Sequence, residues 1–180
     1  MKTIIAMTGS SGSVYRIRLL RTLTGEKVLI VSDTGKRILE YETRLRMEEV
    51  VALADRTYED SDLFAAPASG SYLFDSMVII PCSESTLAKI ANGIADTLIT
   101  RTAAVALKEG RRLILVPRET PVSAIMLENE LKLARLGVAI LPASPGFYPR
   151  PETVEDMVDF VVGKVLDRLG VGHELFKRWE

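Results

Sequence analysis

The sequence has one cysteine, one histidine and one tryptophan in 180 residues, and these scarcities exclude several classes of protein. Cys82 cannot form a disulfide within the chain, and a single thiol cannot build a cysteine-rich zinc or iron–sulfur site. His173 lies in a polar segment near the end, which argues against histidine triads and histidine-rich metal sites. We therefore expect a protein of a reducing, cytoplasmic compartment, and the sequence predicts no metal site.

Long apolar runs and an excess of charge of one sign are also missing. No stretch approaches the roughly 20 apolar residues that span a bilayer, and the start, MKTIIAMTGSSGS, lacks the cleavage site of a signal peptide. The 23 basic and 24 acidic residues give a net charge of −1, so no net field draws the protein to nucleic acid or to an anionic membrane. The expected partner is a small molecule, with no nucleic acid and no membrane.

Short apolar runs that alternate with helical patterns are present instead. Each run is continuous, which is typical of strands covered on both faces of a parallel sheet. The expected strands are residues 3–7, 27–31, 77–81, 113–116 and 138–141. The expected helices are residues 13–23, 34–44, 85–108 with a break near Gly93, 122–136 and 154–169. The polar stretch 56–71 is predicted to be a long surface loop.

This order predicts an α/β fold with a single doubly wound, Rossmann-like (flavodoxin-like) parallel sheet and helices on both faces. The length suits one domain, residues 1–180, in which residues 170–180 form a C-terminal tail. Ligands of such sheets bind at the carboxyl ends of the strands. The residues that follow the strands are therefore the expected site: 8–13, 32–34, 82–86, 118–120 and 144–150.

Two of these loops are rich in small hydroxylated residues and open helices. The loop from Gly9 to Ser13 lets backbone N–H groups approach a phosphate, although a tight turn with a serine N-cap explains it equally well. Its glycine spacing differs from the dinucleotide fingerprint, and no acidic residue ends the second strand. Ser83 to Thr86 repeats this pattern, although Ser83 taken alone is explained more simply as an N-cap. Cys82 is interpreted as a small core residue.

Several cations admit both a structural and a functional interpretation. Arg101 and Lys108 are seven residues apart on one helical face, where they are either surface side chains or ligand contacts. Arg118 and Glu119 follow a buried strand, and this position favours a ligand. The loop 142–151 has four prolines, so it either directs Tyr148 and Arg150 at a ligand or simply closes the core edge. Lys164, taken alone, is a solvated helix lysine.

Six strings in this order resemble the UbiX-type flavin prenyltransferases over nearly the whole chain. The strings are Thr8-Gly-Ser-Ser-Gly-Ser, Pro81-Cys-Ser, Leu98-Ile-Thr-Arg-Thr-Ala-Ala-Val-Ala-Leu-Lys-Glu109, Pro117-Arg-Glu-Thr-Pro121, Gly146-Phe-Tyr-Pro-Arg-Pro151 and Val161-Val-Gly-Lys-Val-Leu-Asp167. The resemblance implies that a dimethylallyl group from dimethylallyl phosphate is joined to N5 and C6 of reduced FMN. It further implies that the product, prenylated FMN, serves a UbiD-type decarboxylase, and that the protein is a homo-oligomer, commonly a dodecamer.

The resemblance also implies roles for particular residues of this sequence. The expected FMN contacts are Gly9, Ser10, Ser11, Ser32, Ser83, Glu84, Ser85, Thr86 and Arg118. The expected contacts to the donor phosphate are Tyr148 and Lys164. The remaining expected catalytic set is Glu42, Arg101, Lys108, Glu119 and Trp179, in which Trp179 comes from the same or a neighbouring subunit. Glu119 is expected to exchange a proton with the leaving phosphate, and Glu42 to manage the proton at flavin N5.

Three positions depart from the family pattern, and two other functions remain open. Ser10 and Gly146 stand where alanine is frequent, and Glu84 stands where an apolar residue is usual. One alternative is a flavin-dependent cysteine decarboxylase, which uses a histidine in the N-terminal half and a Pro-x-Met-Asn segment, neither of which is present. The other alternative is a non-catalytic FMN-binding subunit. The presence of Glu42, Lys108, Glu119, Tyr148 and Lys164 argues against it.

Overall fold

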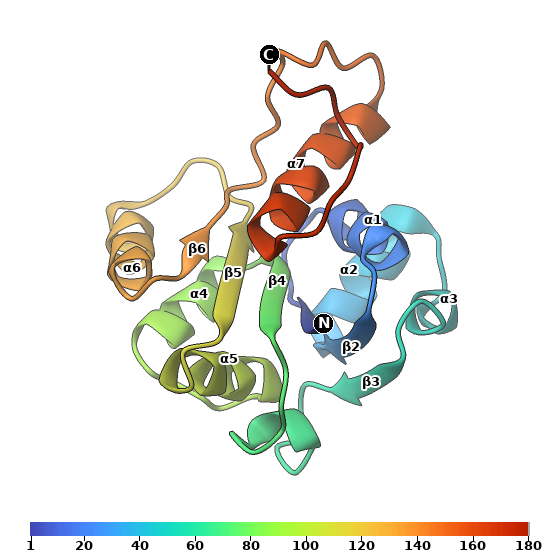
Figure 1. The fold of residues 1–180 in the computed structure, drawn as a ribbon. Coiled ribbons are helices and arrows are strands. Elements are labelled where there is room, and N and C mark those ends of the chain that lie inside the picture. Colours follow the sequence, from blue (N-terminus) through green and yellow to red (C-terminus); the bar gives the residue numbers. More distant parts are fainter. Residues whose placement is uncertain (180) are drawn as a thin grey trace.

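A parallel β-sheet forms the centre of the molecule (Figure 1). The computed structural model describes residues 1–179, and within them the sheet has six strands in the order β3-β2-β1-β4-β5-β6, all paired in parallel. The strands are β1 (Lys2–Met7), β2 (Glu26–Val31), β3 (Arg56–Glu59), β4 (Ser76–Cys82), β5 (Arg112–Pro117) and β6 (Ala139–Ile140). This is the strand order of dinucleotide-binding doubly wound sheets, and it confirms the predicted fold class.

The helices lie on both faces of this sheet. They are α1 (Ser13–Thr22), α2 (Asp33–Thr43), α3 (Met47–Val51), α4 (Glu84–Ala91), α5 (Leu98–Lys108), α6 (Ala124–Arg135) and α7 (Val154–Leu169), with a 3₁₀ turn, η1 (Ala66–Ala68). The predicted helices begin and end within two residues of observed ones, and the expected break near Gly93 separates α4 from α5. The predicted strands match equally well.

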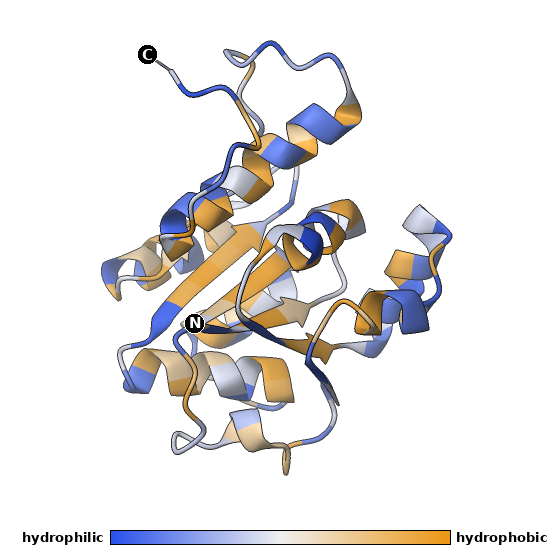
Figure 2. Ribbon diagram, turned by 45° about the vertical axis from the view of Figure 1, so that its right-hand side comes forward, coloured by the Kyte–Doolittle hydropathy of each residue, from blue (hydrophilic) through white to orange (hydrophobic). Residues whose placement is uncertain are grey.

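Alternate strand residues build two separate cores. In β1, Ile4 and Ala6 face one core while Ile5 and Met7 face the other, and all four are fully buried. Helices α4, α5 and α6 cover the first core, and α1, α2, α3 and α7 cover the second. Figure 2 shows the sheet as a hydrophobic layer between amphipathic helices. Burial on both faces explains why the strands are continuous apolar runs.

The prediction of a surface loop over residues 56–71 was wrong in its first part, because Arg56–Glu59 forms strand β3. This strand pairs only with β2 and carries charged, exposed residues at both ends. Edge strands tolerate such residues because one side is unpaired. The sequence therefore lacked the apolar run that identified the inner strands. Helix α3 and the turn η1 were missed as well, since each is shorter than two helical turns.

The topology places a crevice between the two central strands. The chain leaves β1 towards β2 and leaves β4 towards β5, in opposite directions across the sheet. The loops after β1 and β4 therefore diverge at the carboxyl edge, which is where doubly wound sheets bind ligands. Across residues 1–179, no helix combines the length and the apolar character needed to span a bilayer.

Candidate active site

Thr8 joins the loops that follow β1 and β4. Its hydroxyl donates a hydrogen bond to the carbonyl oxygen of Pro81 at 2.8 Å and accepts one from the backbone N–H of Ser83 at 3.0 Å. The side chain is buried, so both backbone groups depend on it rather than on water. The two loops at the crevice are therefore held at a fixed separation by one residue.

The glycine loop lies against the start of α2. A Cβ atom at Gly9 would be 2.6 Å from the Cγ2 atom of Thr34, which is too close for any side chain. Ser32 begins α2, and its hydroxyl accepts a hydrogen bond from the N–H of Gly35 at 3.1 Å. The ends of β1 and β2 thus form one continuous surface of small hydroxylated residues.

The side chain of Glu42, a residue near the C-terminal end of α2, lies at the N-terminus of α1. Its Oε2 atom accepts hydrogen bonds from the backbone N–H groups of Gly12 at 3.0 Å and Ser13 at 2.8 Å. Burial raises the pKa of Glu42, but hydrogen bonds from the Ser11 hydroxyl and from these two N–H groups outweigh it and leave the pKa below its ordinary value. The loop therefore does hold an anion, and that anion is the chain's own carboxylate. A serine N-cap was the wrong alternative, because the N-cap is Gly12 in a left-handed conformation.

Arg118 brings the end of β5 to the same place. Its carbonyl oxygen accepts a hydrogen bond from the Ser10 hydroxyl at 3.2 Å, which links the glycine loop to β5. The Nε atom of Arg118 is buried and has no hydrogen-bond partner among the residues described. The guanidinium lies close enough to Tyr15 to oppose the rise in pKa that burial imposes on that phenol. Glu119 is exposed, and its Oε1 atom accepts a hydrogen bond from the N–H of Thr120 at 3.2 Å.

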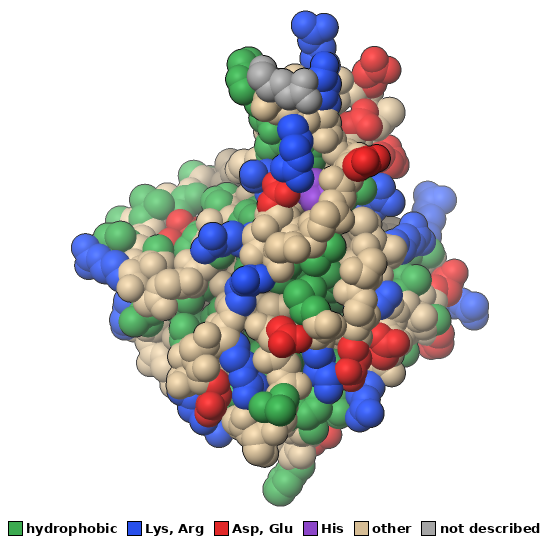
Figure 3. Space-filling view, viewed as in Figure 1, with side chains coloured by type: hydrophobic (Ala, Val, Ile, Leu, Met, Phe, Trp, Pro, Cys, Tyr) green, Lys and Arg blue, Asp and Glu red, His purple; other side chains and the backbone are tan. Residues whose placement is uncertain are grey.

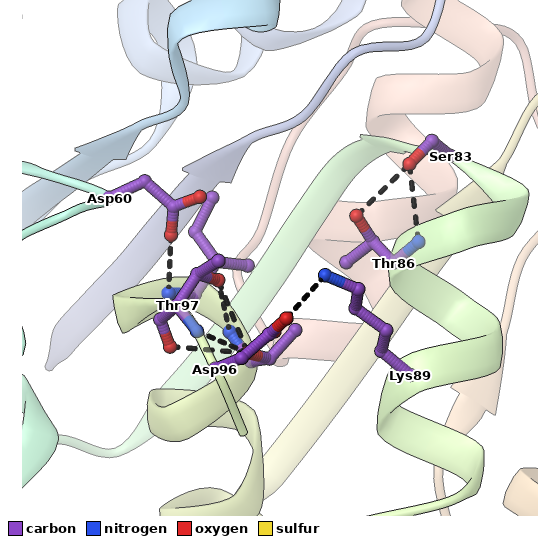
Figure 4. Close-up of polar contacts among 8 residues, drawn as sticks. Asp60, Ser83, Thr86, Lys89, Asp96 and Thr97 are labelled. Atoms are coloured by element: carbon purple, nitrogen blue, oxygen red, sulfur yellow. Dashed lines mark hydrogen bonds and ion pairs between the residues drawn. The ribbon is translucent and has the colours of Figure 1, made fainter. Parts of the chain in front are cut away.

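The start of α4 supplies the hydroxyl groups on the other side of the crevice (Figure 4). Ser83 accepts a hydrogen bond from the N–H of Thr86 at 3.3 Å and donates one to its Oγ1 atom at 3.0 Å, so Ser83 is an N-cap as the simpler interpretation held. Lys89, further along α4, pairs with Asp96 before α5 at 2.7 Å. Glu84 lies near Glu130 of α6 and raises its pKa further, after burial. The Glu84 side chain therefore faces α6.

Arg101 and Lys108 lie elsewhere in the chain. Both contact η1 or the residues just after it: Arg101 Nε donates to the carbonyl oxygen of Ala68 at 2.9 Å, and Lys108 Nζ lies beside Gly70 and pairs with Glu109. They share one face of α5, as their spacing predicted. However, the C-terminal end of α5 leads into the start of β5, which is the amino edge of the sheet. A single chain therefore does not bring Lys108 to the strand ends.

Tyr148, Lys164 and Trp179 gather around α7 instead. The Tyr148 ring makes edge-on contacts with Trp179, with centroids 5.6 Å apart, and with Phe160 at 5.7 Å. Lys164 Nζ lies 3.4 Å from an oxygen of Asp167. Trp179 is 80% exposed and Tyr148 is 42% exposed, so this aromatic cluster has an open face. The proline-rich loop and the C-terminal tail thus meet at one place, against Phe160 of α7.

The sequence placed Thr8 among the residues that follow the strands but assigned it no role, and it gave no indication of two further residues of this region. Tyr15 and Arg16 belong to α1 and gave no signal, since a polar side chain in a helix normally faces solvent. Arg16 is 1% exposed, and within residues 1–179 its Nε and Nη2 atoms have no hydrogen-bond partner. Burial lowers its pKa to about 9, although the nearby Glu42 carboxylate opposes this shift.

Two further expectations concern the cysteine thiol and metal ions. Cys82 is fully buried, and burial raises the pKa of its thiol, with Glu130 adding to the effect, so it is the inert core residue that was predicted. Over the described chain, no group of three or more His, Cys, Asp or Glu side chains is arranged to hold a metal ion. The groups gathered at the strand ends are hydroxyls, backbone N–H groups and one guanidinium.

Comparison with known proteins assigns this site to a class. The family model described as Flavoprotein matches residues 1–166. The flavin prenyltransferase UbiX of Thermoplasma acidophilum is 52% identical over 180 residues, which cover 99% of this chain and 100% of that protein. The chain belongs to the flavoprotein family and, within it, to the UbiX flavin prenyltransferases.

Solved structures of similar proteins agree with this assignment. A dodecameric FMN-dependent UbiX-like decarboxylase from Escherichia coli O157:H7 matches with a TM-score of 0.97 and 46% identity, covering 100% of both chains. The structure of AnUbiX (PadA1) in complex with FMN and dimethylallyl pyrophosphate matches with a TM-score of 0.96 and 42% identity, covering 99% of this chain and 97% of the other. The resemblance predicted from the sequence strings is confirmed.

Proposed function

We propose that this protein is a prenyltransferase that takes reduced FMN as its substrate and joins a dimethylallyl group to its N5 and C6 atoms. The donor is dimethylallyl phosphate, whose carbon–oxygen bond breaks as phosphate leaves. The product, prenylated FMN, passes to a UbiD-type decarboxylase. The observation that carries this proposal is the junction of the ends of β1, β4 and β5 by Thr8 and Ser10, in a chain similar to a UbiX with FMN and a dimethylallyl donor bound.

The residues at the junction suit a flavin mononucleotide. Gly9, Ser10 and Ser11 offer small side chains and backbone N–H groups, and Arg118 offers a buried nitrogen that lacks a partner in the described chain. While Glu42 occupies the N-terminus of α1, an anionic phosphate cannot use that helix end. The hydroxyls at the starts of α2 and α4, which are Ser32, Ser83, Ser85 and Thr86, remain for it. Glu84 faces α6, so only its backbone is available to the flavin.

The donor phosphate is assigned to cations and a phenol rather than to a metal ion. Tyr148 packs against Phe160 of α7, and Lys164 is one turn further along the same helix. Glu119 is exposed at the end of β5, where it can exchange a proton with the leaving phosphate. Positive groups placed where the phosphate gains charge lower the barrier to its departure. We expect turnover to continue in EDTA, and loss of turnover restored by Mg²⁺ would contradict this assignment.

We propose that Arg101 and Lys108 act at a site formed between subunits of an oligomer. Since one chain holds Lys108 beside Gly70, away from the carboxyl ends of the strands, we infer that it completes the site of a neighbouring subunit, to which Arg101 on the same face of α5 also contributes. A homo-oligomer follows, and we propose a dodecamer because the similar Escherichia coli protein is dodecameric. The chain is proposed to form one flavin-binding domain of 180 residues, located in the cytoplasm.

The decisive experiment is anaerobic incubation with reduced FMN and dimethylallyl phosphate, followed by mass analysis of the flavin. The expected product carries one additional five-carbon group. The same assay with dimethylallyl pyrophosphate, the ligand of the similar structure, shows which donor is preferred. An unmodified flavin with both donors, from protein that binds FMN, would overturn the proposal.

A decarboxylase is the second candidate, because one similar structure is described as a UbiX-like decarboxylase. A flavin-dependent cysteine decarboxylase uses a histidine in the N-terminal half, whereas the one histidine here is His173. Release of carbon dioxide from a cysteine-terminated peptide, without any prenyl donor, would favour this candidate.

A further inference from the structure

Asp167, near the end of α7, binds three side chains that come from two segments. Its carboxylate accepts hydrogen bonds from Arg178 at 2.7 and 3.2 Å, lies 3.1 Å from Nε2 of His173, and lies 3.4 Å from Nζ of Lys164. Lys164 is one turn earlier on the same helix, while His173 and Arg178 belong to the C-terminal segment, residues 171–179. In Figure 3 the histidine lies beneath acidic and basic side chains of the projecting part of the molecule.

Aromatic packing fixes the first half of the C-terminal segment. The His173 side chain is 2% exposed, and its ring lies 5.4 Å from that of Phe176, which in turn lies 4.9 Å from that of Phe160. A Cβ atom at Gly163 would approach Phe176 to 2.5 Å, so the segment lies directly on the helix backbone. Beyond Phe176, the described contacts to the rest of the molecule include the pair from Arg178 to Asp167.

The second half of the C-terminal segment places the ring of Trp179 against that of Tyr148. Arg178 immediately precedes Trp179, whose ring meets that of Tyr148 with an interplanar angle of 87°. An edge-on aromatic contact is worth about 0.5–1.5 kcal/mol, too little to order a chain end by itself. The paired hydrogen bonds from Arg178 add a contact of comparable size at the residue before Trp179, and the two contacts together place its ring.

The three partners of Asp167 are held unequally. Hydrogen bonds from Arg178 and then from His173 outweigh burial and lower the pKa of Asp167 to about 2, so the carboxylate is ionised at any physiological pH. Lys164 is the most distant partner, and 47% of its side chain is exposed. Its ammonium group can turn to a second anion while the contact of Asp167 with Arg178 stays in place.

We propose that Asp167 is a positioning residue of the prenyl-donor site: it fixes Trp179 beside Tyr148 through Arg178 and holds Lys164 until the donor phosphate arrives. The inference rests on the proposed function, because it takes Lys164 and Tyr148 to be contacts of that phosphate. In this arrangement, one carboxylate aligns two parts of the site that are 15 positions apart in the sequence, Lys164 and Trp179. The phosphate replaces Asp167 as the partner of Lys164, and no covalent step is involved.

The position of Trp179 can be measured directly, because it is the one tryptophan of the chain. Time-resolved fluorescence anisotropy of the assembled protein with FMN and without donor reports whether the segment is held. We expect Asp167→Asn and Arg178→Gln each to raise the fraction of freely moving Trp179 about three- to tenfold, the range expected for a partly exposed but bidentate ion pair. Glu174→Gln, which removes a carboxylate from the exposed side of the same segment, is the matched control and should leave the decay unchanged.

Steady-state kinetics should distinguish the role of Asp167 from that of Lys164. We expect Asp167→Asn to lower kcat for prenyl transfer without raising KM for dimethylallyl phosphate, because Lys164 is still present and has lost a competing anion. Lys164→Ala should raise KM and leave the anisotropy decay of Trp179 unchanged. Arg178→Lys, which keeps the charge but not the paired hydrogen bonds, should recover part of the kcat lost in Arg178→Gln.

The two measurements also separate failure of this inference from failure of the proposed function. An unchanged anisotropy decay in Asp167→Asn and Arg178→Gln, or a rise in KM for Asp167→Asn equal to that of Lys164→Ala, would overturn the inference. If the wild-type protein transfers no prenyl group, the proposed function fails, whereas the anisotropy still shows whether Asp167 holds Trp179. Should Asp167→Asn fail to fold, Arg178→Gln decides, since the Arg178 side chain is 52% exposed.

Discussion

Lys164 is the single residue that best tests where the donor binds. Its contact with Asp167 is long and exposed, so Lys164→Ala should hardly change the melting temperature. If it binds the donor phosphate, the loss of a charge-assisted hydrogen bond should lower kcat/KM for dimethylallyl phosphate about ten- to a hundredfold, with FMN affinity unchanged. Tyr148→Phe should act in the same direction, and the double variant should lose less than the sum. Lys132→Ala, on α6, is the control. Unchanged donor kinetics in Lys164→Ala would show that Lys164 is a solvated surface lysine with no role in donor binding.

Glu42 gives a prediction about pH. Its pKa is lowered in the folded chain, so its contribution to stability is complete above the ordinary value of 4.5 and is lost as the pH falls through the lowered value. Glu42→Gln should therefore cost about 0.5–2 kcal/mol at pH 7, the range for losing a helix N-cap. Urea unfolding at pH 7 and at pH 3 checks this, because the difference in unfolding free energy between variant and wild type should be smaller at pH 3. An equal difference at both pH values would mean that the charge of the Glu42 carboxylate does not contribute to stability.

The sequence predicted those site residues that can be recognised from their position directly after a strand. Ser32 and Ser83 follow strands, and parallel strands end at one edge, so the spacing of the apolar runs was enough to place them. Arg16 and Asp167 lie inside helices, where a charged residue normally faces water. The burial of Arg16 depends on which helix covers which face, and the pairing of Asp167 depends on how the chain end folds back. Both are long-range facts that local patterns do not contain.

At the scale of elements, the junction between β1 and β4 rests on Thr8. Thr8→Val leaves the carbonyl of Pro81 and the N–H of Ser83 unsatisfied, which should cost about 1–3 kcal/mol and weaken FMN binding by loosening the crevice. Thr3→Val is a matched control, because Thr3 pairs with Ser76 at 3.0 Å and joins the same two strands at their amino ends. It should reduce stability but not FMN affinity, as measured by thermal unfolding and flavin titration. Equal losses of affinity in both variants would show that Thr8 acts through general stability alone.

The elements themselves could be predicted to the extent that they are buried. The inner strands and the long helices were found because both faces of the sheet are covered and the apolar pattern is strong. Strand β3 was not, because its pairing with β2 is visible only once the sheet is assembled. Arg101 and Lys108 were correctly placed on one face of α5, but the sequence could not show that this face turns to residues 68–70.

At the scale of the whole molecule, the position of α5 predicts that active sites are shared between subunits. A Lys108→Ala variant and a Tyr148→Phe variant, each with reduced activity alone, should recover part of it when co-expressed as mixed oligomers, because some sites then receive both native side chains. Mixing two preparations of the same variant is the control. No recovery in mixed oligomers, as confirmed by mass spectrometry of the assembly, would place both residues in one chain's site or outside it.

The carboxylate of Glu42 at the start of α1 has a consequence for the protein before it meets any flavin. Loops of this kind often leave exposed N–H groups that collect sulfate or phosphate from the surroundings. Here Gly12 and Ser13 already donate to Glu42. The flavin-free protein therefore satisfies these two donors with its own carboxylate and needs no ion from the solvent at this helix end.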